Sequence, residues 1–213
     1  MRKSNKITSS IQLPAGPLLF ILSGPSGAGK DAVLIRMREL GSPLGYITTV
    51  TTRSQRDMEV DGVDYHFISE QQFQKILAGN ELLESARVYG NWYGVPRKPV
   101  ELGLAEGRDV IIKVDIQGAS TIKGIFPQAV SIFLVPPLME ELVNRLEQRH
   151  TESSFDMALR LNTAEEEMKQ LPMFNYVVYN KRNEIDSAVE DIKAIIRAEK
   201  CRVNLKVIGN QTS

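Results

Sequence analysis

A glycine-rich stretch directly after an apolar run constrains the fold of this chain more than any other feature. The run at 18–22 reads LLFIL, and the stretch at 24–30 reads GPSGAGK. Two glycines five positions apart, followed by lysine, have the spacing of a phosphate-binding loop between a buried strand and a helix. Glycines let successive backbone N–H groups point inward, and the following helix adds its positive dipole. The stretch predicts a phosphate site, hereafter the P-loop, formed by Gly24, Pro25, Ser26, Gly27, Ala28, Gly29 and Lys30.

The rest of the chain alternates between apolar runs and amphipathic segments. The run at 109–114 is rich in β-branched residues, as expected for a central parallel strand, and shorter runs occur at 130–135 and 176–179. Apolar residues recur at helical spacing in 32–40 and again in 185–203. Strands that alternate with helices predict an α/β fold with a parallel sheet flanked by helices.

Residues 46–96 break this alternation, because strands and turns dominate there. Ser69 and Gln72 have the spacing of a capping box and predict a helix through Leu77. Short strands and an aromatic-bearing tight turn are expected around this helix, the strands at 46–50, 64–68 and 81–89 and the turn at 90–94. The segment is interpreted as an inserted subdomain of mixed α/β structure.

The charge balance and the cysteine content restrict the partners and the compartment. The chain carries 26 Lys and Arg against 26 Asp and Glu, which argues against a nucleic acid or an anionic membrane as partner. No apolar run approaches the length of a membrane span, and residues 1–13 lack the apolar core of a secretory signal. Cys201 is the single cysteine, so a reducing compartment, the cytoplasm, is expected. Neither histidine has the spacing of a transition-metal site.

Several sequence blocks occur in an order that resembles the guanylate kinase family. After the P-loop come TTRSQR at 51–56, EVDGVDY at 59–65, Glu84, GNWYG at 90–94 and VDIQG at 114–118. The resemblance covers nearly the whole chain. It implies that ATP donates its terminal phosphoryl group to GMP, giving ADP and GDP.

The resemblance also implies a division of the chain into three parts. These are a P-loop NTPase core, an inserted mixed α/β subdomain that binds GMP, and a small helical lid. The core is expected at 17–45, 97–144 and 166–203, the insert at 46–96, the lid at 145–165, and flexible tails at 1–16 and 204–213. Monomer and homodimer are both left open.

The phosphate of GMP is expected between two arginines and two tyrosines. Arg53 and Arg56 match the family pair that clamps this phosphate, and guanidinium groups suit it because they bind phosphate oxygens bidentately. Tyr65 and Tyr93 match positions whose hydroxyls complete the phosphate cage. Taken alone, two arginines in a polar loop are solvated and two such tyrosines are half-buried core residues.

The guanine base is expected to be read by Glu84. A carboxylate accepts hydrogen bonds from both N–H donors of guanine, whereas adenine would leave the buried charge unpaired. Thr49 and Asp115 match family positions that assist at the base. Val95 departs from the pattern, because the family commonly has Ser or Thr there, and the lost hydrogen bond costs about 1 kcal/mol.

The remaining matches concern phosphoryl transfer, in which catalysis is mainly positioning and positive charge. Lys30, Arg53, Arg149 and Arg160 are the candidate catalytic residues. Arg145 and Asn180 match positions on the ATP side, although arginines on a helix such as 139–149 are also typical of a solvated face.

Two positions depart from the usual metal site of the family. Asp31 replaces the hydroxyl residue that holds Mg²⁺, and Lys113 stands where an acidic residue is usual. One hypothesis is that Asp31 and Lys113 form an ion pair and that Mg²⁺ is held chiefly by ATP oxygens and water. The alternative is that Asp31 ligates Mg²⁺ directly while Lys113 points to solvent.

Two rival functions fit parts of the pattern. A ribose-bisphosphate phosphokinase resembles this chain in having Asp after the P-loop lysine, but it would not need a guanine pocket. A guanylate-kinase-like interaction module would bind peptides without catalysis, but such modules have degraded P-loops, whereas Lys30 and its glycines are intact here.

Overall fold

A five-stranded parallel sheet, the main sheet, lies at the centre of the computed structural model, which describes residues 16–88, 90–147 and 163–202. Every neighbouring pair in this sheet is parallel, which confirms the predicted fold class. The strands run in the order β2 (Gly45–Tyr46), β7 (Val110–Lys113), β1 (Leu19–Ser23), β8 (Val130–Val135) and β9 (Tyr176–Tyr179).

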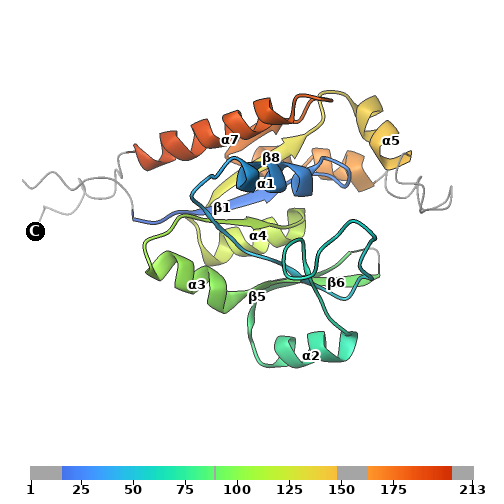
Figure 1. Ribbon diagram of the computed structural model, residues 1–213, viewed down its shortest axis with the longest axis vertical. Coiled ribbons are helices and arrows are strands. Elements are labelled where there is room, and N and C mark those ends of the chain that lie inside the picture. Colours follow the sequence, from blue (N-terminus) through green and yellow to red (C-terminus); the bar gives the residue numbers. More distant parts are fainter. Residues whose placement is uncertain (1–15, 89, 148–162, 203–213) are drawn as a thin grey trace, which may run out of the picture.

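Helices cover both faces of the main sheet, as Figure 1 shows. Alternate side chains of β1 explain why its sequence is apolar throughout. Phe20 and Leu22 pack into one cluster with α1 (Lys30–Glu39) and α7 (Ile185–Lys200). Leu19 and Ile21 pack into a second cluster that includes residues of α3 (Arg97–Ala105) and α4 (Ile116–Ile125). Because both faces are covered, β1 ends in the interior and places the P-loop at the sheet's carboxyl edge.

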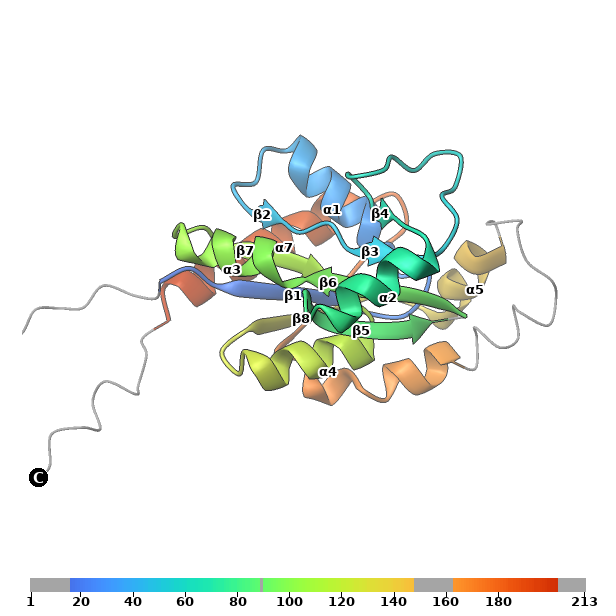
Figure 2. The same cartoon turned by 90° about the horizontal axis from the view of Figure 1, so that it is seen from below.

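A second sheet of four strands is built entirely from residues 46–96. It is mixed, in the order β4 (His66–Phe67), β3 (Val50–Thr51), β6 (Asn91–Pro96) and β5 (Leu82–Val88). Helix α2 (Glu70–Ala78) packs on it through Phe73, and Figure 2 shows this helix beside β5 and β6. The predicted capping box is confirmed, since the Ser69 side chain accepts from the Gln72 backbone and the Gln72 side chain accepts from the Ser69 backbone.

Two sequence predictions in this region were wrong. The strand expected at 46–50 is two strands, because β2 pairs with β7 in the main sheet while β3 pairs with β4 and β6. The turn expected at 90–94 is mostly strand, since β6 begins at Asn91 and pairs with β5 through Pro96. Backbone pairing across the sheet outweighs the local turn preference of glycine and asparagine in GNWYG.

The two sheets share one apolar cluster. Leu83 of β5 and Val95 of β6 belong to the same cluster as Val110 and Ile112 of the main sheet. The second sheet is therefore anchored beside the carboxyl edge of the main sheet, where the P-loop lies.

The remaining described elements lie toward the C-terminal half. Helix α5 spans Met139–Glu147, residues 163–168 are helical, and a short 3-10 helix spans Leu171–Met173. Most of the expected lid at 145–165 and nearly all of both expected tails lie outside the described residues. No helix in the described ranges is long and apolar enough to cross a bilayer.

The core of the second sheet gives a test of stability. Phe73 is fully buried and stacks on Trp92, with ring centroids 5.5 Å apart. Replacing Phe73 with Ala should lower the free energy of unfolding by about 3–5 kcal/mol, because it removes apolar contacts and leaves a cavity. Urea unfolding measures this, with Leu102→Ala, an exposed position on α3, as control. Equal losses in both variants would contradict the packing described.

Candidate active site

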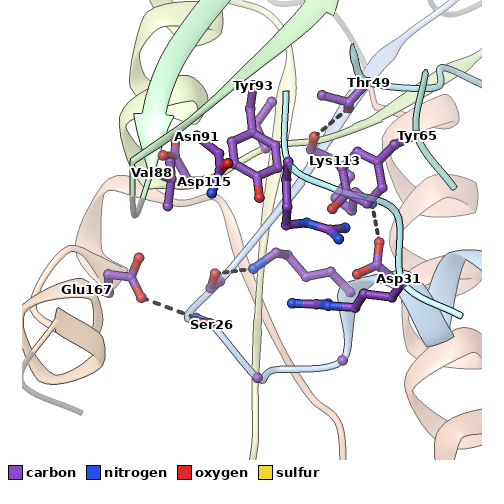
Figure 3. Close-up of a pocket in the computed structure, with 17 residues that line it drawn as sticks. Ser26, Asp31, Thr49, Tyr65, Val88, Asn91, Tyr93, Lys113, Asp115 and Glu167 are labelled. Atoms are coloured by element: carbon purple, nitrogen blue, oxygen red, sulfur yellow. Dashed lines mark hydrogen bonds and ion pairs between the residues drawn. The ribbon is translucent and has the colours of Figure 1, made fainter. Parts of the chain in front are cut away.

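A pocket lies between the P-loop and the second sheet, and Figure 3 shows the side chains that line it. We call it the main pocket. Its wall combines residues from the P-loop and α1, from the second sheet and the segments on either side of β3, from the end of β7 and from the 163–168 helix. The lining residues are Gly24, Ser26, Gly27, Gly29, Lys30, Asp31, Thr49, Arg53, Arg56, Tyr65, Val88, Asn91, Tyr93, Lys113, Val114, Asp115 and Glu167.

The P-loop curls tightly because its glycines adopt conformations that other residues avoid. Gly24, Gly27 and Gly29 all have positive φ, at 143°, 88° and 93°. A Cβ on Gly24 would overlap the backbone carbonyl of Leu134 in β8, so the loop passes directly over the neighbouring strand. The loop therefore exposes backbone N–H groups at the start of α1, which is an anion-binding arrangement.

Lys30 is half-buried and folds back over the loop. Its Nζ donates to the carbonyls of Gly24 and Pro25, the latter at 3.1 Å. Burial lowers the pKa of Lys30, although the nearby carboxylates of Glu167 and Asp31 oppose this. The ammonium is thus held at the loop in a position where a bound phosphate would give it a better partner.

Glu167 places a carboxylate against the P-loop. The backbone N–H of Ser26 donates to Glu167 Oε2 at 3.3 Å, and Figure 3 shows this side chain pointing at the loop. Burial raises the pKa of Glu167, while Lys30 and the Ser26 N–H act in the opposite direction. A carboxylate therefore uses one of the amides that a phosphate oxygen would use. No local sequence pattern signals this contact, because Glu167 lies 141 positions from Ser26.

Arg145 and Asn180 lie on the other side of the P-loop. The Asn180 side chain is buried and donates to the Ala28 carbonyl at 2.8 Å. Arg145 donates to the same carbonyl at 3.3 Å and to the Asn180 carbonyl at 2.6 Å. Both line a second pocket, which also contains Gly27, Gly29 and Lys181. Arg145 and Asn180 are thus next to the P-loop, as expected, but outside the main pocket.

Asp31 and Lys113 are joined directly. Lys113 Nζ donates to Asp31 Oδ1, and the Lys113 side chain is only 9% exposed, against 46% for Asp31. Burial by itself would lower the pKa of Lys113, but Asp31 and Tyr65 outweigh it, so the pKa is raised and the ammonium is retained. The hypothesis of an ion pair is confirmed, and the alternative that Lys113 points to solvent was wrong.

A metal site with its own protein ligands does not fit these residues. Within the described ranges there is no group of three or more His, Cys, Asp or Glu side chains that could hold a metal ion. Asp31, the expected candidate, has one carboxylate oxygen engaged by an ammonium. Mg²⁺ prefers octahedral oxygen ligands and commonly keeps water and substrate phosphates as its ligands. The structure thus supplies no protein cage for Mg²⁺ in this pocket.

Glu59 holds the two arginines of the 51–56 loop. Arg53 Nη2 donates to both carboxylate oxygens of Glu59, at 2.7 and 3.0 Å, and the Arg56 backbone N–H donates to it at 2.9 Å. The Arg56 guanidinium lies 3.7 Å from the same carboxylate. Hydrogen bonds from Arg53 and Arg56 lower the pKa of Glu59, although burial acts against this. In the sequence Glu59 stands only as part of the EVDGVDY block, and nothing there indicates this positioning contact.

The two tyrosines complete this side of the pocket. The rings of Tyr65 and Tyr93 pack edge to face with centroids 6.0 Å apart. The Arg53 guanidinium lies 5.4 Å from the Tyr65 ring centroid and Lys113 Nζ lies 3.8 Å from it. All four cage residues predicted from the sequence therefore line one pocket with the P-loop.

Glu84 is buried beside the pocket wall and is not among the lining residues. A Cβ added at Gly118 would lie 3.0 Å from the Glu84 carboxyl group, so this group rests on the first turn of α4. Asp115 caps that turn, accepting from the Gly118 N–H at 2.7 Å, and it does line the pocket. Burial, and then the charge of Asp115, raise the pKa of Glu84 to about 8. Glu84 makes no hydrogen bond or ion pair to other residues in the described part of the chain.

Two further residues were expected near Glu84. Thr49 lines the pocket, and its hydroxyl donates to the Lys113 carbonyl at 3.3 Å. Val95 pairs with Glu84 across β5 and β6 but is fully buried in the apolar cluster, away from the pocket surface. Arg149 and Arg160 lie outside the described residues.

Removing the charge of Glu167 should strengthen ATP binding. Glu167→Gln keeps the side-chain size but removes a carboxylate that competes with phosphate oxygens for the Ser26 amide and repels them. We expect the dissociation constant for ATP to fall by a factor of about 3 to 10, with that for GMP unchanged.

Equilibrium titration measures this effect, and the adjacent Glu166→Gln is the matched control. Glu166 is exposed and pairs with Lys169, so its replacement should leave ATP binding as it is. Weaker ATP binding in Glu167→Gln would show that the carboxylate supports the nucleotide instead.

Comparison with known proteins agrees with the geometry. The guanylate kinase family model matches residues 17–199. A guanylate kinase of Caldanaerobacter subterraneus subsp. tengcongensis is 46% identical over 187 residues, which cover 88% of this chain and 90% of that protein. Guanylate kinase 2, chloroplastic/mitochondrial, of Oryza sativa subsp. japonica is 41% identical over 197 residues, 92% of this chain and 69% of that protein.

A solved structure shares the fold. The crystal structure of guanylate kinase from Anaplasma phagocytophilum superposes with a TM-score of 0.71 at 30% sequence identity, covering 90% of each chain. The family match spans both sheets, the P-loop and the arginine and tyrosine cage. The chain belongs to the guanylate kinase family.

Proposed function

We propose that this protein is an ATP:GMP phosphotransferase, which transfers the terminal phosphoryl group of ATP to GMP and yields ADP and GDP. One observation carries the proposal. A P-loop with its lysine and a cage of two arginines and two tyrosines line the same pocket, so a phosphate donor and a phosphate acceptor can meet there.

The P-loop suits the donor. Its backbone amides and the N-terminus of α1 favour the phosphates of ATP, and Lys30 can exchange its loop carbonyls for an outer phosphate. Arg145 and Asn180 lie beside the loop on the second pocket, which we assign to the rest of ATP. Gly24, Pro25, Ser26, Gly27, Ala28, Gly29 and Asp31 complete the proposed ATP side.

The opposite wall suits the acceptor. Glu59 fixes Arg53 and Arg56, so both guanidinium groups are oriented before GMP arrives, which reduces the entropy lost on binding. Tyr65 and Tyr93 supply hydroxyls beside them. In phosphoryl transfer the protein mainly positions the two reactants and stabilises charge, and no side-chain nucleophile is needed.

Guanine recognition is assigned to Glu84, with Asp115, Thr49 and the main chain near Val95 around it. A buried carboxyl group without a protein partner is costly unless a ligand satisfies it. The two N–H groups on one edge of guanine are such a ligand. Adenine offers an acceptor at the same place and would leave Glu84 unsatisfied.

Several further features belong to the proposal. Arg149 and Arg160 are assigned as catalytic arginines on a lid at 145–165 that excludes water when it closes. Mg²⁺ is expected to enter with ATP, bound through phosphate oxygens and water, with Asp31 as the one protein candidate. The proposal includes the division into a core, a GMP-binding insert at 46–96 and a lid. It also includes a cytoplasmic location and the lack of a nucleic-acid partner. The protein is either a monomer or a homodimer.

The rival functions are less well supported. A ribose-bisphosphate phosphokinase would not need Glu84, Thr49 and Tyr93 around one pocket. An interaction module would not need a P-loop with intact glycines and a lysine held against the loop carbonyls.

A coupled assay that detects ADP separates these functions. We expect ADP formation from ATP to depend on GMP and to be at least a hundredfold slower with AMP, because a site with buried polar groups rejects a partner that leaves them unpaired. Ribose bisphosphate should give no activity. ADP formation independent of GMP, or none with any acceptor, would overturn the proposal.

The raised pKa of Glu84 predicts that GMP binding is linked to proton release. The free protein holds a proton on Glu84 below pH of about 8, whereas the guanine edge requires the ionised carboxylate. The association constant for GMP should therefore rise with pH and level off above about 8. Titration calorimetry at pH 7 in two buffers of different ionisation enthalpy should show release of up to about one proton.

Glu84→Gln is the matched control for this linkage. Gln resembles the protonated form, which is the form that stabilises the fold, since the folded-state pKa lies above the ordinary value of 4.5. The variant should thus fold, bind GMP weakly and release only the protons that come from the GMP phosphate. A flat pH profile in the unmodified protein would exclude Glu84 as the base-reading group.

A further inference from the structure

Lys113 is a buried cation on the pocket wall that the arginine and tyrosine cage does not include. It ends β7, beside Leu22 of β1, so the main sheet fixes its backbone. Its Nζ pairs with Asp31 on one side and lies 3.8 Å from the centroid of the Tyr65 ring on the other. In Figure 3 it sits between the α1 side of the pocket and the cage.

The pair with Asp31 does not explain why Lys113 is buried. Taking an ammonium out of water is costly, and an ion pair repays this only when both partners are well enclosed. Asp31 is 46% exposed, so its attraction is screened by solvent. The ammonium has three donors, of which one serves Asp31 and a second interacts with the Tyr65 side chain, so a third is left for a ligand. An anionic ligand in the pocket would add a partner for this third donor and further offset the cost of burial.

The position of Lys113 favours the acceptor side of the pocket. The Tyr65 ring packs against Lys113 Nζ and also against the Arg53 guanidinium, which lies 5.4 Å from the ring centroid. The Lys113 carbonyl accepts from Thr49, which belongs to the proposed guanine side. The donor side already has its own lysine, because Lys30 lies on the P-loop carbonyls.

We propose that Lys113 is a further phosphate-binding residue of the acceptor site, and that its ammonium, oriented by Asp31 and the Tyr65 ring, contacts the phosphate of GMP without a metal ion. This inference rests on the proposed function, because it takes GMP as the acceptor. It gives the replacement of an acidic residue by Lys113 a role, since a fixed protein cation then stands in the pocket where a protein-bound metal ion does not fit.

The test compares GMP with guanosine, which has the same base and sugar but no phosphate. Binding of each is measured by titration calorimetry in EDTA and without ATP. In Lys113→Met the dissociation constant for GMP should rise about ten- to a hundredfold, as expected for the loss of a hydrogen bond to a charged group, while that for guanosine stays unchanged. Lys113→Arg should recover part of the affinity for GMP.

Two further variants complete the design. Lys75→Met removes one positive charge from an exposed position of α2 and should change neither constant. Asp31→Asn keeps Lys113 but removes its charged partner, and it should weaken GMP binding several-fold without affecting guanosine. Asp31→Asn also tests the proposal if Lys113→Met fails to fold.

The outcomes separate this inference from the proposed function. Unchanged GMP binding in Lys113→Met would overturn the inference and leave the function standing. Equal losses for GMP and guanosine would show a structural role and would also overturn it, as would weaker ATP binding with GMP binding intact. Failure of the unmodified protein to bind GMP at all would overturn the proposed function itself.

Discussion

The close passage of Gly24 over the carbonyl of Leu134 is the contact on which the site depends. It exists because β1 and β8 are neighbours in a parallel sheet, and because β1 ends under the loop that opens α1. A side chain at Gly24 would push the loop away from β8, and the loop amides would then no longer point toward the phosphate site. The phosphate-binding geometry is thus a consequence of strand order together with one residue that has no Cβ.

In the free protein, most charged side chains of the main pocket are paired with other groups of the protein. Glu59 pairs with Arg53, Asp31 pairs with Lys113, and Glu167 accepts from the Ser26 amide. These contacts keep charged groups oriented inside a pocket, where unpaired charges would be costly. Ligands therefore replace existing partners, and binding energies reflect differences between two sets of contacts. Glu84, buried beside the pocket wall, has no hydrogen-bond or ion-pair partner among the described residues, and burial holds it as a neutral acid until a ligand pairs with it.

Much of the fold was predictable from the sequence, because the apolar runs and the P-loop spacing are local signals. The parallel sheet and the capped helix α2 were anticipated, and the Asp31–Lys113 pair was one of two hypotheses for those residues. The strand boundaries within 46–96 were not predictable. β2 and β3 are distinct strands only because β2 joins the main sheet and β3 joins the second sheet. That choice is made by long-range pairing, which local propensity does not encode.

The candidate site was likewise predictable where the signal is local and not where it depends on long-range contacts. Residues in recognisable blocks, such as Arg53, Tyr65 and Asp115, were found and do line one pocket. Glu167 was missed because its partner is an amide at the opposite end of the chain. The burial of Glu84 behind the pocket surface also required the structure, since it depends on how closely α4 approaches β5 at Gly118.

The bond from Asn180 to Ala28 has a consequence for synthesis of the protein. Asn180 follows β9, and its side chain holds the P-loop carbonyl across 152 positions of sequence. During translation the loop emerges 152 residues before the residue that braces it. A nascent chain arrested before β9 could contain every glycine of the loop and still lack its finished shape. Competence to hold a nucleotide is therefore acquired only after β9 and Asn180 have been synthesised.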